Sequence, residues 1–330
     1  MASALKGLRM NGLRMNGMKT HIGIAALVVA VVAGMAGCAD PGGAVRGAAP
    51  AADAAGAASR KAVQPSRELR LIQYNIRSFE GYAANWDHCT EVVKHDQMIE
   101  RFALELSLYN PDVICLEEVP SEAAAARLAA RMGMHYTHFK GGWKGKGWPE
   151  GISGAVLSKY PIVEAKTHPS LNWTERPQDL FTRFWGRAVL DTPAGPLVVH
   201  AMHGYHADSK IRLRELAEVL PVVQKDIQAG KSVILMGDLN HEPDSQEYKQ
   251  IAVAGLADSF VGLSGAADLL TCPSTVRKER IDYIWSAGPI SKRLKSAKVL
   301  FEGAFRTNPD DPTSYAMSDH VPVLAVFSMP

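Results

Sequence analysis

Carboxylate, amide and histidine side chains recur beside short apolar runs that have the pattern of strands. Five such clusters are present: Asn75; Glu117 with Glu118; His203; Asp238 with Asn240; and Asp319 with His320. One cluster alone is typical of a turn, because Asp and Asn commonly follow strands. Five clusters are harder to explain as turns, since ligands of α/β proteins gather where strands end. The pattern predicts one polar site assembled from several strand ends.

The donor atoms of these clusters indicate which metal the site would take. Asp, Glu and Asn side chains offer hard oxygen ligands, which suit Mg²⁺ or Mn²⁺ more than Zn²⁺. The chain contains no Cys-x-x-Cys and no His-Glu-x-x-His pattern. A magnesium site of this kind most often acts on phosphate esters, where the cation neutralises phosphoryl oxygens and the charge developing on the leaving oxygen. We therefore expect Mg²⁺, or Mn²⁺, as the cofactor.

Alternating strand and helix patterns position these clusters. Apolar runs predict strands at 69–76, 113–116, 155–157, 188–190, 197–202, 233–236, 281–285 and 321–327. Helical spacing predicts helices around 99–106, over 121–132 and over 211–226. Ser121 is a plausible N-cap of the second helix, and Gly133 stands just beyond its end. No linker-like stretch divides this region, so one mixed α/β domain is expected.

Six ordered motifs carry a family resemblance that covers nearly all of this region. They are Tyr-Asn-Ile at 74–76, Pro-Asp-Val-Ile-Cys-Leu-Glu-Glu-Val at 111–119, Ala-Val-Leu-Ser-Lys-Tyr-Pro-Ile at 155–162, Gly-Asp-Leu-Asn at 237–240, Arg-Ile-Asp-Tyr-Ile at 280–284 and Ser-Asp-His-Val-Pro-Val at 318–323. With these motifs the chain resembles the endonuclease/exonuclease/phosphatase superfamily. The resemblance implies the α/β class and a four-layer αββα sandwich of two packed mixed β-sheets, as in deoxyribonuclease I.

The resemblance also implies roles for individual residues. Glu118 and Asn75 would hold the divalent metal, and Asp319 would contact a second metal or support the site. His320 would be the general base that activates water, with Asp282 holding its imidazole in orientation. Water would then attack phosphorus in line, with no covalent enzyme intermediate.

Three further residues take roles from the same resemblance, and two positions depart from the usual pattern. Asp238 would position or deprotonate the attacking water, while Asn240 and His203 would donate hydrogen bonds to the phosphoryl oxygens. Glu117 stands where Gln usually precedes the metal-binding glutamate, and its carboxylate adds negative charge or faces the other side of the strand. Residues 202–204 read Met-His-Gly in place of Thr-His-Leu.

Four residues outside these motifs are candidate substrate contacts: Trp143, Tyr205, His206 and Arg187. Trp143 lies in a glycine- and lysine-rich stretch, 140–148, whose tryptophans could stack on a base or enter a lipid surface. A solvent loop with anchoring tryptophans explains this stretch equally well. Tyr205 and His206 are expected in a loop beside the site, where specificity often resides. Arg187 fits a solvated strand face as well as a phosphate contact.

The N-terminal part of the chain has the pattern of an export signal followed by a tether. Residues 22–33 are apolar without interruption, which fits a signal-peptide core and is short for a membrane span. Small residues lead to Cys38 and resemble a bacterial lipobox, so Cys38 is the expected lipidation site, with ordinary cleavage nearby as the alternative. We expect a signal peptide over 1–38, a flexible Ala/Gly/Pro-rich linker over 39–66 and a catalytic domain over 67–330. The protein would be exported and either lipid-anchored to the bacterial cell envelope or secreted or periplasmic.

Charge and cysteine content narrow the function further. The chain has 36 basic and 34 acidic residues, but four of the basic ones and none of the acidic ones lie in residues 1–37. The remainder, with 32 basic and 34 acidic residues, would bind nucleic acid only through a local basic patch. Cys115 lies among apolar residues and is expected to be an inert core thiol. Whether Cys89 and Cys272 pair in an exported protein stays open.

These features predict an exported, Mg²⁺-dependent phosphoesterase. A phosphodiesterase is favoured, acting on nucleic acid, on a phospholipid such as sphingomyelin, or on a small phosphodiester. The alternatives are a phosphomonoesterase of sugar or inositol phosphates and a catalytically inactive binding lipoprotein. The complete set of site residues argues against the inactive form. Membrane contact is expected through the lipid anchor, and no protein partner is implied.

Overall fold

The fold is seen in a computed structural model that describes residues 68–83, 95–143, 148, 150–172, 179–261, 269–311 and 313–330. Its strands are β1 (Glu68–Asn75), β2 (Tyr82–Ala83), β3 (Val113–Val119), β4 (His135–Phe139), β5 (Ser153–Ser158), β6 (Ile162–Thr167), β7 (Trp185–Thr192), β8 (Gly195–Met202), β9 (Ser232–Asp238), β10 (Ala257–Asp258), β11 (Asp282–Ala287), β12 (Leu294–Val299), β13 (Tyr315–Ala316) and β14 (Val323–Ser328). Its α-helices are α2 (His95–Ser107), α3 (Glu122–Met132), α4 (Ser209–Gln228) and α5 (Gln246–Val253).

The large strands form two six-stranded mixed sheets. The first sheet has the order β12-β14-β1-β3-β5-β4, and the second has the order β10-β11-β9-β8-β7-β6. Each contains one parallel pair, β1 with β3 and β8 with β9, and its other pairs are antiparallel. A helix follows the first strand of each parallel pair and leads back to the second, as parallel neighbours require.

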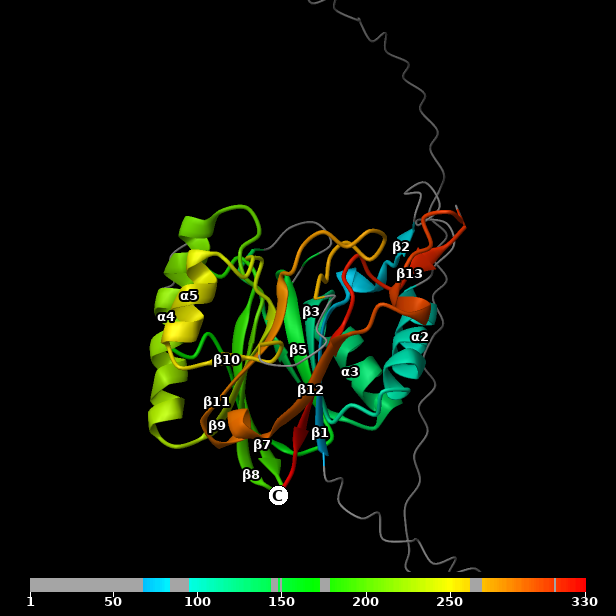
Figure 1. Cartoon of the computed structure of the whole chain (residues 1–330). Helices are drawn as coiled ribbons and strands as arrows, with labels where there is room; N and C mark the ends of the chain where they lie inside the picture. Colours follow the sequence, from blue (N-terminus) through cyan, green and yellow to red (C-terminus); the bar gives the residue numbers. More distant parts are fainter. Residues whose placement is uncertain are drawn as a thin grey trace, which may run out of the picture. The chain divides into compact units, whose positions relative to one another are not determined.

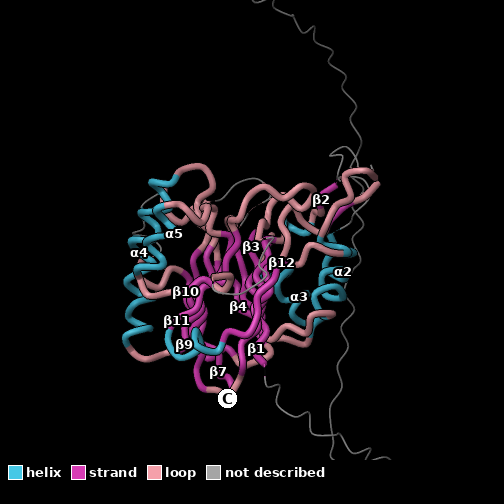
Figure 2. The backbone as a smooth tube through the Cα atoms, in the orientation of Figure 1, coloured by secondary structure: helices cyan, strands magenta, loops and turns pink. Residues whose placement is uncertain are grey.

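Helices cover the outer face of each sheet, which confirms the expected four-layer sandwich. Helices α2 and α3 lie against the first sheet, and α4 and α5 lie against the second (Figure 1). The backbone tube shows both sheets between these two groups of helices (Figure 2). Parallel pairs buried on both faces read as continuous apolar runs, which is why β3 and β9 are so apolar in sequence.

Helix α3 shows how local sequence sets the boundaries of an element. The Ser121 hydroxyl accepts a hydrogen bond from the Ala124 amide at 3.2 Å, which satisfies one of the free amides of the first turn. Gly133 ends the helix in the left-handed region, at φ 64°, where a side chain would be strained. Both boundaries match those expected from the sequence.

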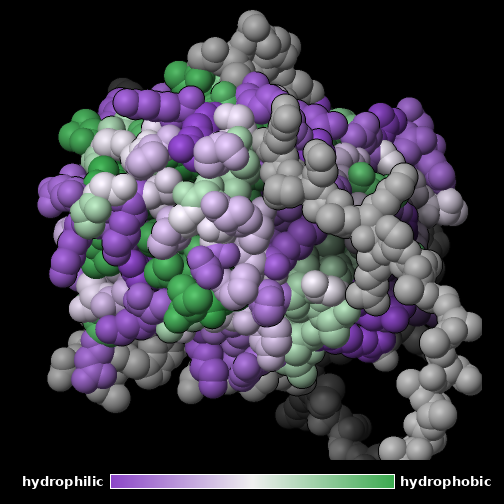
Figure 3. Space-filling view, turned by 90° about the horizontal axis from the view of Figure 1, so that it is seen from below, coloured by the Kyte–Doolittle hydropathy of each residue, from purple (hydrophilic) through white to green (hydrophobic). Residues whose placement is uncertain are grey.

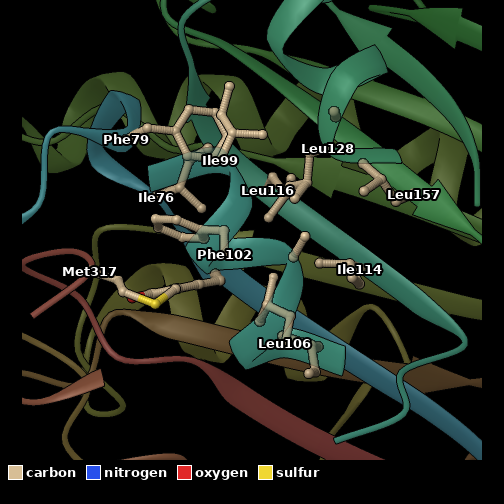
Figure 4. Close-up of a cluster of buried hydrophobic side chains, with 14 of the residues drawn as sticks. Ile76, Phe79, Ile99, Phe102, Leu106, Ile114, Leu116, Leu128, Leu157 and Met317 are labelled. Carbon is tan, nitrogen blue, oxygen red and sulfur yellow. The ribbon is translucent and has the colours of Figure 1, made fainter. Parts of the chain in front are cut away.

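Apolar side chains fill all three spaces between the four layers. Helices α2 and α3 pack on the first sheet through a cluster that includes Phe102, Leu106, Ile114, Leu116 and Leu128 (Figure 4). A second cluster lies between the sheets, and a third lies between the second sheet and α4 with α5.

The layer between the sheets changes character along its length. On β1, Leu69 and Leu71 belong to the apolar cluster between the sheets, whereas Gln73 and Asn75 continue the same face with polar side chains. Strand β9 repeats this change, because Met236 lies in the cluster and Asp238 follows it. One end of the sandwich is therefore apolar inside, and the other end is polar.

The end of the sandwich that is apolar inside carries the beginning of β1 and the end of β14, where Glu68 pairs with Ser328. Seen from that end, hydrophilic and hydrophobic residues are intermixed on the surface (Figure 3). Among the described helices, none is both long enough and apolar enough to cross a membrane.

The sequence did not predict the four edge strands of the two large sheets, the two strands of the small sheet or one helix: β4, β6, β10, β12, β2, β13 and α5. Strand β6 is mostly exposed, so it lacks the continuous apolar run that marks a buried strand. The strand expected at 188–190 extends over the whole of β7, and the helix expected at 211–226 begins two residues earlier, at Ser209.

Candidate active site

The strand ends meet at the polar end of the layer between the sheets, with Asp238 at their centre. Its Oδ2 atom accepts a hydrogen bond from Asn75 Nδ2 at 3.0 Å. The same oxygen lies 3.4 Å from His203 Nε2 and 3.7 Å from His320 Nε2. Burial and the nearby Asp282 raise the pKa of Asp238 to about 7, although the charge of His320 opposes them.

His320 and Asp282 form a buried hydrogen-bonded pair beside Asp238. His320 Nδ1 lies 2.9 Å from Asp282 Oδ2, so the Nε2 atom is turned toward Asp238. Burial lowers the pKa of His320, but Asp282 and Asp238 outweigh it and hold this pKa well above its usual value. The geometry is that of a proton-carrying imidazole oriented by a carboxylate.

A glutamine and a second glutamate hold the other side of Asp282. Gln73 Nε2 donates to Asp282 Oδ1 and to Glu117 Oε2, each at 2.8 Å. The Cys115 thiol donates to the other oxygen of Glu117 at 3.0 Å. Burial raises the pKa of Glu117 to about 8, and the charges of Asp282 and Asp238 add to this. The departure from Gln at position 117 thus places a buried carboxyl group next to Gln73, on the side of Asp282 away from His320.

A break in the strand separates Glu117 from Glu118. The pairing of β3 with β5 shifts register between Glu117 and Val119, and Glu118 has φ 56°. Such a bulge re-aims a side chain that strict alternation would turn away. Glu118 Oε1 consequently lies 3.3 Å from Asn75 Nδ2, at the rim of the cluster.

The donor set at this rim fits a divalent cation. Burial raises the pKa of Glu118, and the neighbouring charge of Asp319 raises it further. Two carboxylates that repel one another in a buried place are relieved by a bound cation, and both offer the oxygen atoms that Mg²⁺ prefers. Glu118, Asp319 and Asn75 are the residues that would hold it. Asp319 also lies 3.6 Å from Arg77 Nε, which fixes its position.

His203 lies in the cluster, but its hydrogen bond runs to another side chain. Arg183 Nε donates to His203 Nε2 at 2.9 Å. Burial and the charge of Arg183 lower the pKa of His203 well below its usual value, so the ring is neutral. In this arrangement the guanidinium of Arg183 carries the positive charge, and the neutral His203 ring orients that guanidinium. Asn240 Nδ2 donates to the Gly204 carbonyl at 3.1 Å, and its backbone amide donates to Asp238.

The departure at Gly204 has a steric reason. A Cβ atom at this position would lie 2.6 Å from the Leu239 carbonyl oxygen, closer than real Cβ contacts come. The Gly204 amide in turn donates to the Asp238 carbonyl at 2.9 Å. Glycine lets the segment after β8 press against the segment after β9, and this contact brings His203 next to Asp238.

Three of the four expected substrate contacts come together at one cavity, which Trp143, Tyr205 and His206 line along with Arg183. Arg187, the fourth, lies elsewhere. Its guanidinium faces α4 and is buried in a two-pronged ion pair with Asp226, with N–O distances of 2.8 and 2.9 Å. The alternation along β7 turns Arg187 away from the layer between the sheets, so its place is structural.

Two sequence predictions concern residues outside the described part of the chain. Cys38, the expected lipidation site, lies there with the signal peptide and the linker. Cys89 lies there too, so its pairing with Cys272 stays a prediction. Cys115 is fully buried among apolar side chains, as its neighbours in sequence predict.

Several contacts of the cluster were not assigned from the sequence. Gln73 could have been found, because it stands two residues before Asn75 and a strand returns to the same face every second residue. Arg183 and Cys272 gave no such signal. Cys272 forms a hydrogen bond with His320, and both residues come from loops whose course no periodicity fixes.

Comparison with known proteins gives one family and many similar folds. A model of the Endonuclease/Exonuclease/phosphatase family matches residues 72–320. No curated protein sequence matches the chain. An endonuclease/exonuclease/phosphatase from Beutenbergia cavernae DSM 12333 has a similar structure, with 23% identity, a TM-score of 0.55, and coverage of 80% of this chain and 72% of that one.

Two other similar structures have more specific names. A mannosyl-6-phosphatase from Bacteroides thetaiotaomicron VPI-5482 shares 18% identity, covers 78% of this chain and 98% of its own, and gives a TM-score of 0.60. The human Nocturnin catalytic domain with a bound sulfate anion shares 20% identity, covers 80% and 94%, and gives a TM-score of 0.58. At these identities the likeness shows the fold and leaves the substrate open.

Proposed function

Because the chain belongs to the endonuclease/exonuclease/phosphatase family, we propose that it hydrolyses phosphate esters with the help of Mg²⁺ or Mn²⁺, and that its substrates are phosphodiesters. The family consists of phosphate-ester hydrolases. One observation supports catalysis more than any other: the His320–Asp282 pair lies beside Asp238 and next to the oxygen-rich rim formed by Glu118 and Asn75. A protein that used the fold only for binding would have no need of this arrangement.

The residues of the cluster divide the work of an in-line displacement. Within the pair formed by His320 Nε2 and Asp238 Oδ2, which lie 3.7 Å apart, His320 already carries a proton, so the attacking water loses its proton to Asp238. Asp282 holds the imidazole in orientation and stabilises its charged form, and Gln73 holds Asp282. A positioned base of this kind contributes about 10²- to 10⁴-fold in rate.

Two further groups act on the phosphoryl oxygens. Arg183, held by His203, donates toward them and offsets their charge. Glu118, Asn75 and Asp319 would hold the cation. When bound, the cation neutralises phosphoryl oxygens and the charge that develops on the leaving oxygen.

The proposal includes export of the protein, which rests on the sequence of residues 1–38 alone. With Cys38 lipidated, the catalytic unit would act on the outer side of the cytoplasmic membrane or in the periplasm. Its partners would be the phosphate-ester substrate and, through the lipid anchor, the membrane.

The test is hydrolysis of bis-p-nitrophenyl phosphate by the purified protein in Mg²⁺, in Mn²⁺ and in EDTA. We expect metal-dependent release of p-nitrophenol, and a loss of at least about 100-fold in His320→Ala, since the charged imidazole beside the accepting carboxylate is removed. The monoester p-nitrophenyl phosphate, assayed in parallel, separates a phosphodiesterase from a phosphomonoesterase.

The outcomes of this assay decide between the readings. Preferential release from the monoester would replace the diesterase with a phosphomonoesterase. No release from either ester by protein whose thermal unfolding is cooperative would contradict catalysis and favour a binding lipoprotein. Equal release by the wild type and His320→Ala would reject the site.

A further inference from the structure

The cavity beside Arg183 has a composition that the proposed chemistry leaves unused. It has a volume of about 300 Å³ and is lined by Trp143, Ile152, Thr182, Arg183, Tyr205 and His206. Three of these six side chains are aromatic rings. Arg183 connects the cavity to the catalytic cluster, because its Nε atom lies 2.9 Å from His203 Nε2. A group attached to a phosphate held at the cluster would therefore be next to this cavity.

Backbone hydrogen bonds fix one wall of the cavity. The Trp143 amide donates to the Thr182 carbonyl at 2.7 Å, and the Gly142 amide donates to the carbonyls of Phe181 and Arg183 at 3.0 Å. Gly141 makes this approach possible, because a Cβ there would lie 2.4 Å from the Ile152 carbonyl oxygen. Trp143 is therefore anchored in its backbone while its side chain stays 46% exposed.

A single buried carboxyl group joins this wall to the opposite one. Glu215 of α4 accepts the Phe181 amide at 2.8 Å through one oxygen and the Tyr205 amide at 3.2 Å through the other. The Tyr205 ring lies under the Arg183 guanidinium, whose central carbon is 5.7 Å from the ring centroid. Both walls are thus set before any ligand arrives, which lowers the entropy cost of binding.

The charge of the cavity selects among ligands. Among the described residues that line it, Arg183 is the only permanently charged one, and none is a carboxylate. Burial and the charges of Arg183 and Arg212 lower the pKa of His206. A quaternary ammonium headgroup would meet Arg183 without a carboxylate to offset it. The hydroxyl of Thr182 is buried and has no hydrogen-bond partner among the described residues, so a polar edge of a ligand can use it.

We propose that this cavity, the aromatic pocket, binds the base of a nucleotide whose phosphate occupies the catalytic cluster. The inference rests on the proposed function and makes it narrower: the substrates are nucleotide phosphodiesters rather than phospholipids. A base stacks on aromatic rings regardless of its sequence, and its polar edge takes hydrogen bonds from groups such as Thr182 and Arg183. The near-neutral charge of the mature chain, which favours no long polyanion, is compatible with a short nucleotide substrate.

Calorimetric titration in Mg²⁺ with two probes tests the pocket. Adenosine 5′-monophosphate and ribose 5-phosphate carry the same phosphomonoester, and only the first carries a base. We expect the wild type to bind the nucleotide about 5- to 100-fold more tightly than the sugar phosphate. Trp143→Ala and Tyr205→Ala should remove most of this preference by weakening nucleotide binding, and Tyr205→Phe, which keeps the ring, should retain it.

The matched control is Tyr136→Ala, which removes a tyrosine that is 38% exposed on β4 and does not line the pocket. It should leave both affinities unchanged. Equal affinity of the wild type for the two probes, binding of neither probe, or a preference that survives both alanine variants would overturn the proposal. Choline phosphate bound more tightly than the nucleotide would overturn it in favour of a lipid headgroup.

The outcomes for the pocket and for the proposed function can be told apart. Hydrolysis of bis-p-nitrophenyl phosphate without a base preference contradicts the aromatic pocket alone. A base preference that depends on Trp143 and Tyr205, in a protein that hydrolyses neither chromogenic ester, contradicts the proposed catalysis and leaves the pocket standing.

Discussion

His320 and His200 are both buried histidines that contact an aspartate, but they lie on opposite faces of the second sheet. His320 Nδ1 is 2.9 Å from Asp282 in the layer between the sheets, and His200 Nε2 is 3.2 Å from Asp226 beneath α4. The residue types and the distances are nearly the same. The difference between the two pairs lies in what else touches each aspartate.

Asp226 is surrounded by cations. Arg187 holds it with two hydrogen bonds and Lys231 Nζ adds a third at 2.7 Å. Burial raises the pKa of Asp226, but the hydrogen bonds from His200, Arg187 and Lys231 outweigh it and hold this pKa far below its usual range. Burial in turn lowers the pKa of His200, so the ring stays neutral. This pair has its charge fully satisfied and has no proton to exchange near neutral pH.

Among the described residues, His320 is the one cationic partner of Asp282. The second oxygen of Asp282 accepts from the neutral Gln73, and Asp238 adds another carboxylate nearby. The negative charges of Asp282 and Asp238 therefore stabilise the protonated imidazole of His320, and the pKa of His320 rises. The comparison teaches that a buried His–Asp pair becomes reactive when its aspartate is left short of positive charge, and structural when cations saturate it.

The largest expected effect is on the reactive pair. Asp282→Asn keeps the size of the side chain and removes the charge that orients and stabilises His320. We expect turnover of bis-p-nitrophenyl phosphate to fall by about 10²- to 10⁴-fold. The free energy of unfolding in urea should change by less than about 1 kcal/mol, because the amide oxygen can still accept from Gln73 and the amide NH2 can donate to the other tautomer of His320.

The contrast between the pairs would be lost if Asp282→Asn unfolded readily while keeping its turnover. Such a result would mean that Asp282, like Asp226, serves the fold. Circular dichroism of the variant, measured beside the wild type, separates a folded inactive protein from an unfolded one.

Asp226→Asn should show the reverse pattern. It leaves the buried Arg187 guanidinium without its main partner, and removing one partner of a buried ion pair costs about 3–5 kcal/mol. Turnover by the folded variant should stay within about twofold of the wild type, since Asp226 contacts none of the catalytic residues. Urea unfolding and single-concentration turnover on the same preparation check both statements. A large loss of turnover at wild-type stability would contradict the division between the two pairs.

The smallest expected effect is on the pH dependence of stability. The pKa of Asp226 is lowered in the folded state, so its contribution to stability is present above the pKa of the unfolded chain, about 4. It is lost as the pH falls below that value toward the folded pKa. The stability difference between the wild type and Asp226→Asn should therefore shrink between pH 5 and pH 3, in urea titrations at about five pH values.

Glu117→Gln is the matched control, because the pKa of Glu117 is shifted in the opposite direction from that of Asp226. The pKa of Glu117 is raised to about 8 in the folded state, so the unfolded chain ionises first as the pH rises. The wild type loses stability from about pH 4.5 to pH 8, and the glutamine variant is spared this loss. Its advantage over the wild type should grow with pH. Parallel curves for the wild type and both variants would contradict the assigned surroundings of these carboxyls.

The sequence was informative where a side chain's role follows from its place along a strand. Asn75, His203 and Asp238 each extend an apolar strand face by two residues, so period-two alternation was enough to send all three to the layer between the sheets. The same rule separated His200 from His203. Ser121 and Gly133 fixed the ends of α3 by capping chemistry, which is also local.

Other features depended on contacts that no local pattern encodes. Arg187 obeys the same alternation, but its partner Asp226 lies on a helix 39 residues further along the chain. No sequence pattern predicts an ion pair between two residues this far apart. The donation from Arg183 to His203 depends on the course of a loop. Strand β6 was missed because an exposed edge strand gains its stability from backbone pairing with β7, and such pairing selects few apolar residues.

The position of β14 gives the catalytic cluster a place in the order of folding. This strand lies between β12 and β1, in the interior of the first sheet, and the segment before it carries His320. The Ser318 hydroxyl, in the same segment, donates to the Asn75 carbonyl at 2.7 Å. A chain emerging from the ribosome brings β1 out long before β14. The catalytic cluster is therefore complete only when β14, the last strand, has paired with β1.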